Sequence, residues 1–307
     1  MKKRKIVFGV LWLTGLLLIF VAATTDLLLD DQQSDYPRIS VVWDDTTEDY
    51  VENYKNYMTR YMDLKSLDFH FCTMDEPVSA KQQMEIILRE EESGADLILV
   101  KPVEEAELEE LLEESSLSVP LLCIDGKMES DSVNVSLYSD DQQRGRHLAE
   151  RIQKDYPNWE ICLLSDGRNT GRDERIYQAM KENAGETQVR LCQWEENGRL
   201  SDVTEDAQNI VFVASNPRLL EQVADQNEKG YPLYGFGYND RILYAMEQGQ
   251  IQGINVYSAF QMGWESIRYA FKILDGEDYE KEVILEDSTI GAEEMFDQEY
   301  EDILFYL

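Results

Sequence analysis

Short runs of apolar residues alternate along this chain with longer stretches in which apolar residues recur every three or four positions. Residues 79–125 display this alternation most clearly. Ser79 and Gln82 have the spacing of a capping box, which predicts that a helix begins there. Apolar runs at 96–100, unbroken after Asp96, and at 121–124 are separated by a second amphipathic stretch and predict two strands that are covered on both faces. Strand, helix and strand with short connections predict a right-handed parallel crossover.

The same alternation extends over most of the chain and falls into two blocks of similar length. The other predicted strands are 38–43, 67–72, 133–137, 160–165, 189–194, 209–215, 232–236, 251–256 and 283–285. Predicted helices between them include 143–153, 172–183, 217–228, 241–248 and 258–274. The strand at 133–137 alternates apolar and polar residues, which is typical of a sheet edge. The pattern predicts the α/β fold class, with two doubly wound parallel-sheet lobes that face each other across a cleft.

The N-terminal segment has a different character. Residues 2–5 are all basic, and 6–23 are apolar apart from one threonine. This length is near the lower limit for a membrane-spanning helix, and the basic flank is expected to stay in the cytoplasm. We therefore predict a cytoplasmic flank at 1–5, a single transmembrane signal-anchor at 6–23 and a linker at 24–36, with the rest of the chain outside the cell membrane. Residues 21–23 also resemble a signal-peptidase site, so cleavage is the alternative.

Charge and composition exclude several classes of partner. The formal net charge is −34, and a surface of this sign repels the phosphates of DNA and RNA. The acidic residues are interpreted as a solubilising surface, because no loop has the EF-hand spacing that calcium requires. With two histidines and no CxxC motif, no zinc site is expected.

The motifs of common catalytic sites do not occur. There is no P-loop and no GxSxG, and Gly235-Phe-Gly237 lacks the third glycine of a dinucleotide fingerprint. No enzymatic activity and no cofactor are predicted. The four cysteines, Cys72, Cys123, Cys162 and Cys192, lie in predicted strands and are expected to be reduced core residues. Only Cys162 and Cys192 are expected on neighbouring strands, and whether they form a disulfide stays open.

Several short motifs occur in an order that resembles a known family. They are Lys81-Gln-Gln83, the segments 94–102 and 119–125, Gly235-Phe-Gly237, and 257–263 followed by 274–276. Together they resemble the sugar-binding periplasmic proteins of the ribose-binding type (periplasmic binding protein type I), whose fold is shared by the effector domains of lac-repressor-type regulators. The resemblance covers roughly 37–289. A DNA-binding regulator is disfavoured, because the predicted membrane segment occupies the place of a helix-turn-helix.

The resemblance implies two lobes and a hinge. The lobes would comprise 37–136 with 256–285, and 137–255 with 286–307, joined by crossings near 135–139, 253–257 and 286–289. Ligand would bind between the lobes and close the hinge. Members of the family hand their ligand to the permease subunits of an ABC importer or report it to a receptor, for which a membrane sensor histidine kinase is the expected partner here.

Some ligand positions of the family have counterparts in this chain. The resemblance implies Asp44 and Tyr50 after the first strand, Asp125 after the fourth, Arg172 or alternatively Arg175 in the second lobe, and Asn216 before a helix. Other positions depart from the family pattern. Gly126 stands where an arginine is common, Gly237 replaces an aspartate with Asp240 nearby, and Tyr257 replaces a glutamine.

The chemistry of a sugar explains why such residues are candidates. Carboxylates, amides and guanidinium groups form paired hydrogen bonds with hydroxyls, and aromatic rings cover the apolar CH faces. Aromatic residues at or near predicted strand ends are Trp43, Tyr50, Trp194, Tyr238 and Tyr257. Each candidate also has a structural alternative: rings can cover the core, Asn216 can cap a helix, and Arg172 can pair with a neighbouring carboxylate.

These observations predict a membrane-anchored extracytoplasmic solute-binding protein for a sugar or similar small polar ligand. The alternative is an extracytoplasmic scaffold that has lost sugar binding and mediates only protein contacts, because half of the family's polar set is changed.

Overall fold

The computed structural model describes residues 36–44, 54–59, 67–74, 78–195, 198–203 and 209–305. The chain divides into two compact units, Met1–Pro37 and Arg38–Leu307, and all the described helices and strands belong to the second. No helix within the described ranges is both long and apolar enough to span a bilayer. The predicted anchor at 6–23 lies outside the described residues.

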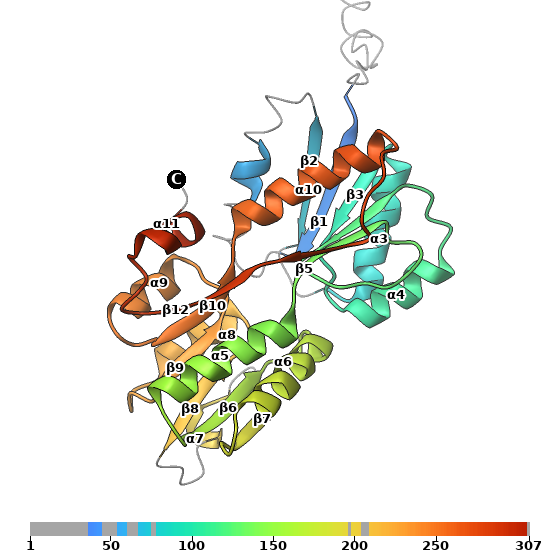
Figure 1. Ribbon diagram of the computed structural model, residues 1–307. Coiled ribbons are helices and arrows are strands. Elements are labelled where there is room, and N and C mark those ends of the chain that lie inside the picture. The colour runs from blue at the N-terminus through green and yellow to red at the C-terminus, as the bar shows by residue number, and fades with distance from the viewer. Residues whose placement is uncertain are drawn as a thin grey trace, which may run out of the picture. The chain divides into compact units, whose positions relative to one another are not determined.

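The first six-stranded sheet is parallel throughout and has the order β11-β5-β4-β3-β1-β2 (Figure 1). Its strands are β1 (Arg38–Asp44), β2 (Asp68–Met74), β3 (Leu97–Val100), β4 (Leu121–Ile124), β5 (Val135–Ser139) and β11 (Glu282–Leu285). Helices α3 (Ala80–Glu92) and α4 (Glu105–Glu114) pack on one face, and α10 (Ala259–Leu274) packs on the other. We call this sheet with its three helices lobe one.

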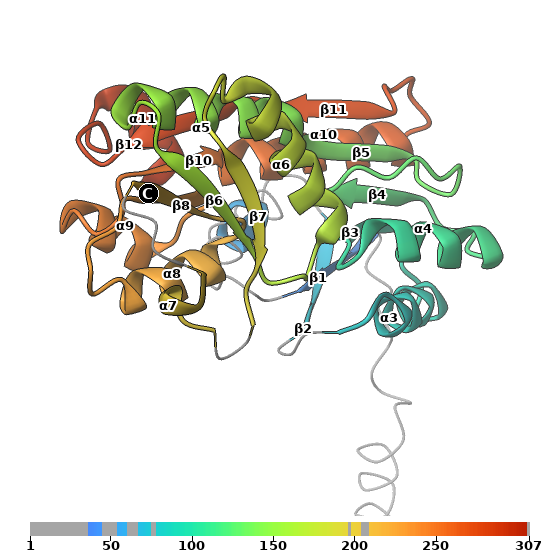
Figure 2. The same cartoon turned by 90° about the horizontal axis from the view of Figure 1, so that it is seen from below.

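The second six-stranded sheet has the order β12-β10-β9-β8-β6-β7. Its strands are β6 (Glu160–Ser165), β7 (Val189–Gln193), β8 (Ile210–Ala214), β9 (Leu233–Phe236), β10 (Gly253–Tyr257) and β12 (Asp287–Gly291), the last antiparallel to β10. Helices α5 (Asp141–Asp155) and α6 (Thr170–Asn183) cover one face (Figures 1 and 2), and α8 (Pro217–Gln226) and α9 (Asp240–Glu247) cover the other. We call this layered unit lobe two. The other described elements are the short helices α7 (Leu200–Val203) and α11 (Gln298–Leu304) and a helical segment at 54–59, whose Tyr57 contacts Phe260 of α10.

The chain passes between the two sheets three times: from β5 to α5, from β10 to α10, and from β11 to β12. The first two passages are short because a side chain caps the helix that follows. The third consists of the single residue between β11 and β12. Asp140 accepts hydrogen bonds from the amides of Gln142 and Gln143 at the start of α5, and Ser258 accepts one from Gln261 at the start of α10. These caps allow the helices to begin directly after the strands.

The capping box predicted at the start of α3 is confirmed. The amide of Gln82 donates to Ser79 Oγ over 3.3 Å, and the amide of Ser79 donates to Gln82 Oε1 over 3.0 Å. Ala80, Met84 and Ile87 then face the sheet. Local sequence therefore determines where this helix begins and which side it buries.

The structure corrects two predictions. The fifth strand begins at Val135 rather than Val133, because the amide of Val133 turns back to the carbonyl of Ser130. It is also not an edge strand, because β11 pairs with it from the far end of the chain. In addition, β12 was not predicted, since Asp287–Gly291 lacks the apolar run that marks the other strands.

Cys162 and Cys192 lie on neighbouring strands, as predicted, and all four cysteines are free thiols. Cys162 and Cys123 are buried, whereas Cys192 and Cys72 are half-buried. The sulfur atoms of Cys162 and Cys192 are 3.0 Å apart, but Cys192 lies opposite Leu164 in the register, diagonal to Cys162.

The central position of β3 generates a prediction. Leu99 is completely buried between the two helix layers, so we expect Leu99→Ala to lower the free energy of unfolding by about 2–5 kcal/mol through lost burial and the cavity it leaves. Ile284 lies on the edge strand β11 and is 55% exposed, so Ile284→Ala should cost less than about 1 kcal/mol. Urea unfolding of both variants measures the difference, and equal losses would contradict the burial of β3.

Candidate functional site

Polar side chains from both lobes meet at the carboxyl ends of the parallel strands. Lys101 follows β3 and Asp125 follows β4 in lobe one, while Arg172 lies in the first turn of α6 and Tyr257 ends β10 in lobe two. Asp125 and Arg172 both line two adjoining cavities of 190 and 90 Å³. Open parallel sheets bind their ligands at this edge, so these cavities form the candidate site.

Asp125 is the centre of this site. Its backbone has φ = 53°, in the left-handed region that aspartate tolerates better than most residues and that is enriched at functional sites. Its carboxylate accepts a short hydrogen bond from the Tyr257 hydroxyl and lies 3.2 Å from Lys101 Nζ. Burial by itself would raise the pKa of Asp125. The positive charges of Lys101 and Arg172, together with the bond from Tyr257, outweigh that effect and hold the pKa below its usual range.

The Tyr257 hydroxyl is buried between lobe one and lobe two and remains protonated. Burial, and then the charge of Asp125, raises the pKa of Tyr257 well above its ordinary value. The hydroxyl is therefore a donor at neutral pH, and the carboxylate is its acceptor.

Two glycines explain where the chain departs from the family pattern. A Cβ atom on Gly126 would lie 2.6 Å from Pro102 Cγ, so the arginine common at this position does not fit. Gly237 has φ = 83°, and a Cβ atom there would lie 2.5 Å from Pro217 Cγ. At both positions the glycine backbone packs closely against a proline ring, which leaves no room for the larger side chain.

Arg144 lies almost completely buried at the back of the site. Its Nε donates to Asn255 Oδ1 over 2.8 Å, and its guanidinium lies 5.1 Å from the Phe236 ring centroid and 5.3 Å from that of Tyr257. These ring contacts have the geometry of cation–π interactions. Arg144 therefore orients the aromatic wall of the 90 Å³ cavity.

A hydrogen-bond network continues from Arg144 to the passages between the sheets. Asn255 on β10 donates from Nδ2 to Asp287 Oδ2 over 2.6 Å and to Thr289 Oγ1 over 3.0 Å. His147 on α5 also contacts Asp287, with 2.9 Å between Nδ1 and Oδ2. The site is thus linked to β10, β12 and α5, the elements that adjoin the three passages.

Asp141 forms ion pairs with Arg172 and Arg175 of lobe two. It lies 3.4 Å from Arg172 Nε and accepts hydrogen bonds of 2.8 and 3.1 Å from Arg175. Arg175 also donates to Glu105 Oε2 of lobe one over 2.9 Å, so this ion pair connects the lobes. Burial opposes the charge of Arg172, but Asp141 and Asp125 raise its pKa above the ordinary value. Burial raises the pKa of Glu105, partly offset by Arg175.

The structure places the remaining sequence candidates differently. Asn216 lines the 90 Å³ cavity and also caps α8 by accepting from the amide of Leu219, while Tyr238 lines the same cavity and donates to the carbonyl of Ile303.

Trp194 is buried in the core and lines neither cavity. Asp240 is exposed and lines a separate 400 Å³ cavity formed by lobe two alone. Trp43 is buried, with Lys101 Nζ 5.1 Å from its ring centroid. Tyr50 and the Asp44 side chain lie outside the described residues.

The sequence prediction missed six charged residues that line the two cavities: Lys101, Glu105, Lys127, Asp140, Asp141 and Arg144. For two of them the sequence contains a usable signal. Lys101 directly follows an apolar strand, and Arg144 precedes Leu148 and Ile152 at steps of four, which places a charge in the buried stripe of α5. Glu105 and Asp141 have no such signal, because glutamate and aspartate in a first helical turn are common.

Two parallel-sheet lobes with a polar site between their strand ends define a two-lobed α/β binding protein. Residues 39–278 match the sequence profile of the periplasmic binding protein domain. The chain therefore belongs to the periplasmic binding protein type I family. No curated protein matches the chain.

Solved structures share this fold at low sequence identity. A carbohydrate transporter solute-binding protein from Agrobacterium radiobacter, in complex with D-arabinose, is 18% identical, with a TM-score of 0.76 over 89% of this chain and 99% of its own. An ABC transporter solute-binding protein from Agrobacterium vitis with bound D-fucose is 14% identical, with a TM-score of 0.76 over 87% and 100%. A glucose-galactose binding protein from Geobacillus stearothermophilus is 13% identical, with a TM-score of 0.74 over 85% and 99%.

The lowered pKa of Asp125 predicts a pH-dependent contribution to stability. A carboxylate whose pKa is depressed on folding stabilises the protein above its unfolded pKa, and that contribution disappears as pH falls through the folded value. The difference in unfolding free energy between the wild type and Asp125→Asn should therefore be largest above about pH 5 and shrink below about pH 4. Urea unfolding across this range measures it.

Asp131→Asn is the matched control, because the Asp131 side chain is fully exposed. This variant should change the free energy of unfolding little. A difference for Asp125→Asn that does not vary with pH would show that the carboxylate is not held in its charged form.

Proposed function

We propose that this protein is an extracytoplasmic solute-binding protein that takes a sugar or a similar small polar ligand between its two lobes. The observation that carries this proposal is the meeting of Asp125 and Lys101 from lobe one with Arg172 and Tyr257 from lobe two around shared cavities. A carboxylate beside a guanidinium offers an acceptor and paired donors to neighbouring sugar hydroxyls.

The 90 Å³ cavity has an aromatic wall, which suits the apolar CH faces of a sugar. Phe236, Tyr238 and Tyr257 line it together, and aromatic rings cover the CH faces of sugars. The solved structures of the same fold support this ligand class, since two of those described above hold D-arabinose and D-fucose.

Binding would act by closing a hinge at the three passages between the sheets. A ligand that contacts both lobes favours the closed arrangement by its additional contacts there. Ligand hydroxyls would exchange with the Tyr257 hydroxyl on Asp125, so the charged groups stay compensated in both states.

We further propose that residues 6–23 are a membrane anchor and 24–36 a linker, which keep the binding lobes at the outer face of the cell membrane. Two classes of membrane partner suit a tethered binding protein. The permease subunits of an ABC importer would receive the ligand, and the outer domain of a sensor histidine kinase would read the closed state.

One observation favours a second candidate function, a scaffold that works without ligand. Asp125 is already bonded by Tyr257 and Lys101 of the chain itself, and Gly126 and Gly237 cannot carry the polar side chains that the family often has there. Under this alternative the same bonds hold the lobes together permanently, and the protein serves only as a surface for other proteins.

A thermal-shift screen against monosaccharides, disaccharides, polyols and nucleosides distinguishes the two functions. Ligand at a hundredfold excess over its Kd stabilises the folded state by about 2.7 kcal/mol, so a binder should raise the melting temperature clearly. Asp125→Ala and Arg172→Ala should abolish this shift, since each removes a charged hydrogen-bond partner from the shared cavities.

Asp240→Ala and Arg241→Ala are the matched controls, because both residues line the separate cavity of lobe two. They should keep the shift. If no ligand class shifts the folded wild type, the scaffold function is favoured. If the controls lose the shift while the site variants retain it, the site lies in lobe two alone.

The anchor predicts an intact N-terminus. The mature protein isolated from membranes should begin at or next to Met1, because an uncleaved signal-anchor retains its basic flank. Intact-mass measurement and N-terminal sequencing check this, and a mature N-terminus at Thr24 would instead indicate a cleaved signal peptide.

A further inference from the structure

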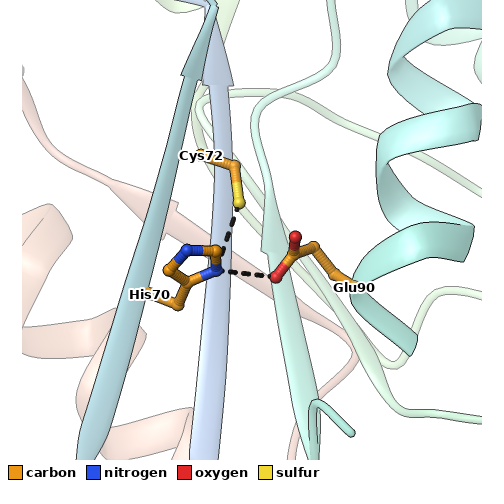
Figure 3. A group of neighbouring side chains, drawn as sticks. All are labelled: His70, Cys72 and Glu90. Atoms are coloured by element: carbon orange, nitrogen blue, oxygen red, sulfur yellow. Dashed lines mark hydrogen bonds and ion pairs between the residues drawn. The ribbon is translucent and has the colours of Figure 1, made fainter. Parts of the chain in front are cut away.

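Three side chains with metal-binding atoms meet in lobe one, away from the cavities described above. His70 and Cys72 lie two positions apart on β2, so they project from the same face of the sheet, and Glu90 reaches toward them from α3 (Figure 3). One potential ligand atom from each residue lies within 4.8 Å of the other two. The sequence spacing does not predict this group, because a strand and a helix bring it together.

The distances within the group are close to those of a coordination shell. His70 Nδ1 lies 2.7 Å from Glu90 Oε2 and 3.5 Å from Cys72 Sγ. Ligand atoms at about 2.0–2.3 Å from a tetrahedral zinc ion are themselves roughly 3.3–3.8 Å apart. The 3.5 Å between His70 Nδ1 and Cys72 Sγ is within this range, and the 2.7 Å hydrogen bond between His70 Nδ1 and Glu90 Oε2 would have to widen by roughly 0.6 Å or more to admit an ion.

We propose that His70, Cys72 and Glu90 form a binding site for a zinc-class divalent cation, with water as the fourth ligand. The donor set is one imidazole, one thiolate and one carboxylate. This mixture suits a borderline-soft ion such as Zn²⁺ and is unlike the all-oxygen sets that hold Ca²⁺ or Mg²⁺. Three protein ligands leave a coordination position open to solvent, and the His70 side chain is 49% exposed, which provides an entry path.

A hydrogen bond from Ser40 fixes the orientation of the Glu90 carboxylate. Ser40 on β1 donates from Oγ to Glu90 Oε2 over 2.8 Å, and the Glu90 side chain is only 4% exposed. Such outer partners fix the orientation of a metal ligand. A buried carboxylate that is held in place on a helix is a stronger ligand than a mobile surface one.

Arg38 is the cation that a metal ion would replace. Its Nη2 lies 3.6 Å from Glu90 Oε2 and 3.4 Å from His70 Nδ1. Its Nη1 donates separately to the carbonyl of Ser93 over 2.8 Å, so the guanidinium keeps a partner when it withdraws from Glu90. The charge of Glu90 then passes from an arginine to the ion, and no buried carboxylate is left uncompensated.

A thiol must lose its proton to become a metal ligand, so binding of the ion is accompanied by release of a proton from Cys72. The bound ion would tie β2, an edge strand, to α3, and would stabilise lobe one without touching the cavity that holds Asp125.

Cobalt substitution tests the site directly. The full-length chain in mild detergent, reduced with a phosphine and freed of metal by chelation, is titrated with Co²⁺ and then with Zn²⁺. We expect a thiolate-to-cobalt charge-transfer band that saturates at one ion per chain and is removed by zinc. Cys72→Ser should lose the band, and His70→Gln should weaken zinc affinity by at least about tenfold.

Cys192→Ser is the matched control, because Cys192 is another half-buried cysteine on an edge strand. This variant should keep both the band and the zinc affinity. A folded wild type without a band would overturn the proposal. So would a band that persists in Cys72→Ser, or one that is lost in Cys192→Ser instead.

Discussion

Parallel strand pairing is the constraint from which the site follows. Each crossover returns the chain to the start of the next strand, so the carboxyl ends of all the parallel strands meet at one edge. Lys101 and Asp125 become neighbours for this reason alone, since each is simply the first residue after its strand. Lobe two repeats the arrangement and contributes Tyr257 at the end of β10. The charged cluster is therefore produced by topology, and no local motif specifies it.

A buried carboxylate makes the two lobes depend on each other. Lys101, Arg172 and Tyr257 lower the pKa of Asp125 against the effect of burial, and two of these three belong to the other lobe. Arg172 in turn relies on Asp141, and breaking one member of such a group leaves an uncompensated charge, which costs more than the pair itself contributes. The arrangement of the lobes and the ionisation of the site are therefore parts of one equilibrium.

The sequence predicted the elements of the fold better than the site. Apolar runs such as Leu97–Val100 are unambiguous because strands covered on both faces tolerate little else. The strand β12 is not predicted because it is polar. The alternating pattern of β5 predicts an edge strand, but β11 from the distant C-terminal region pairs with it. Within the site, Asp125, Arg172 and Tyr257 could be placed at strand ends or helix starts. Spacing places Arg144 in the buried stripe of α5, but no spacing reveals its contacts with Phe236 and Asn255, which come from other elements.

The ion pair between Glu105 and Arg175 has a consequence for binding energetics. It joins the lobes through the chain's own atoms, so it favours a closed arrangement whether or not a solute is bound. A partly exposed pair of this kind contributes at most about 1 kcal/mol, which corresponds to a factor of about five in the ratio of closed to open molecules. The apparent affinity for a solute scales with the fraction of protein molecules in the conformation that is competent to bind it. Ionic strength, which screens the pair, would thus adjust affinity without altering a single ligand contact.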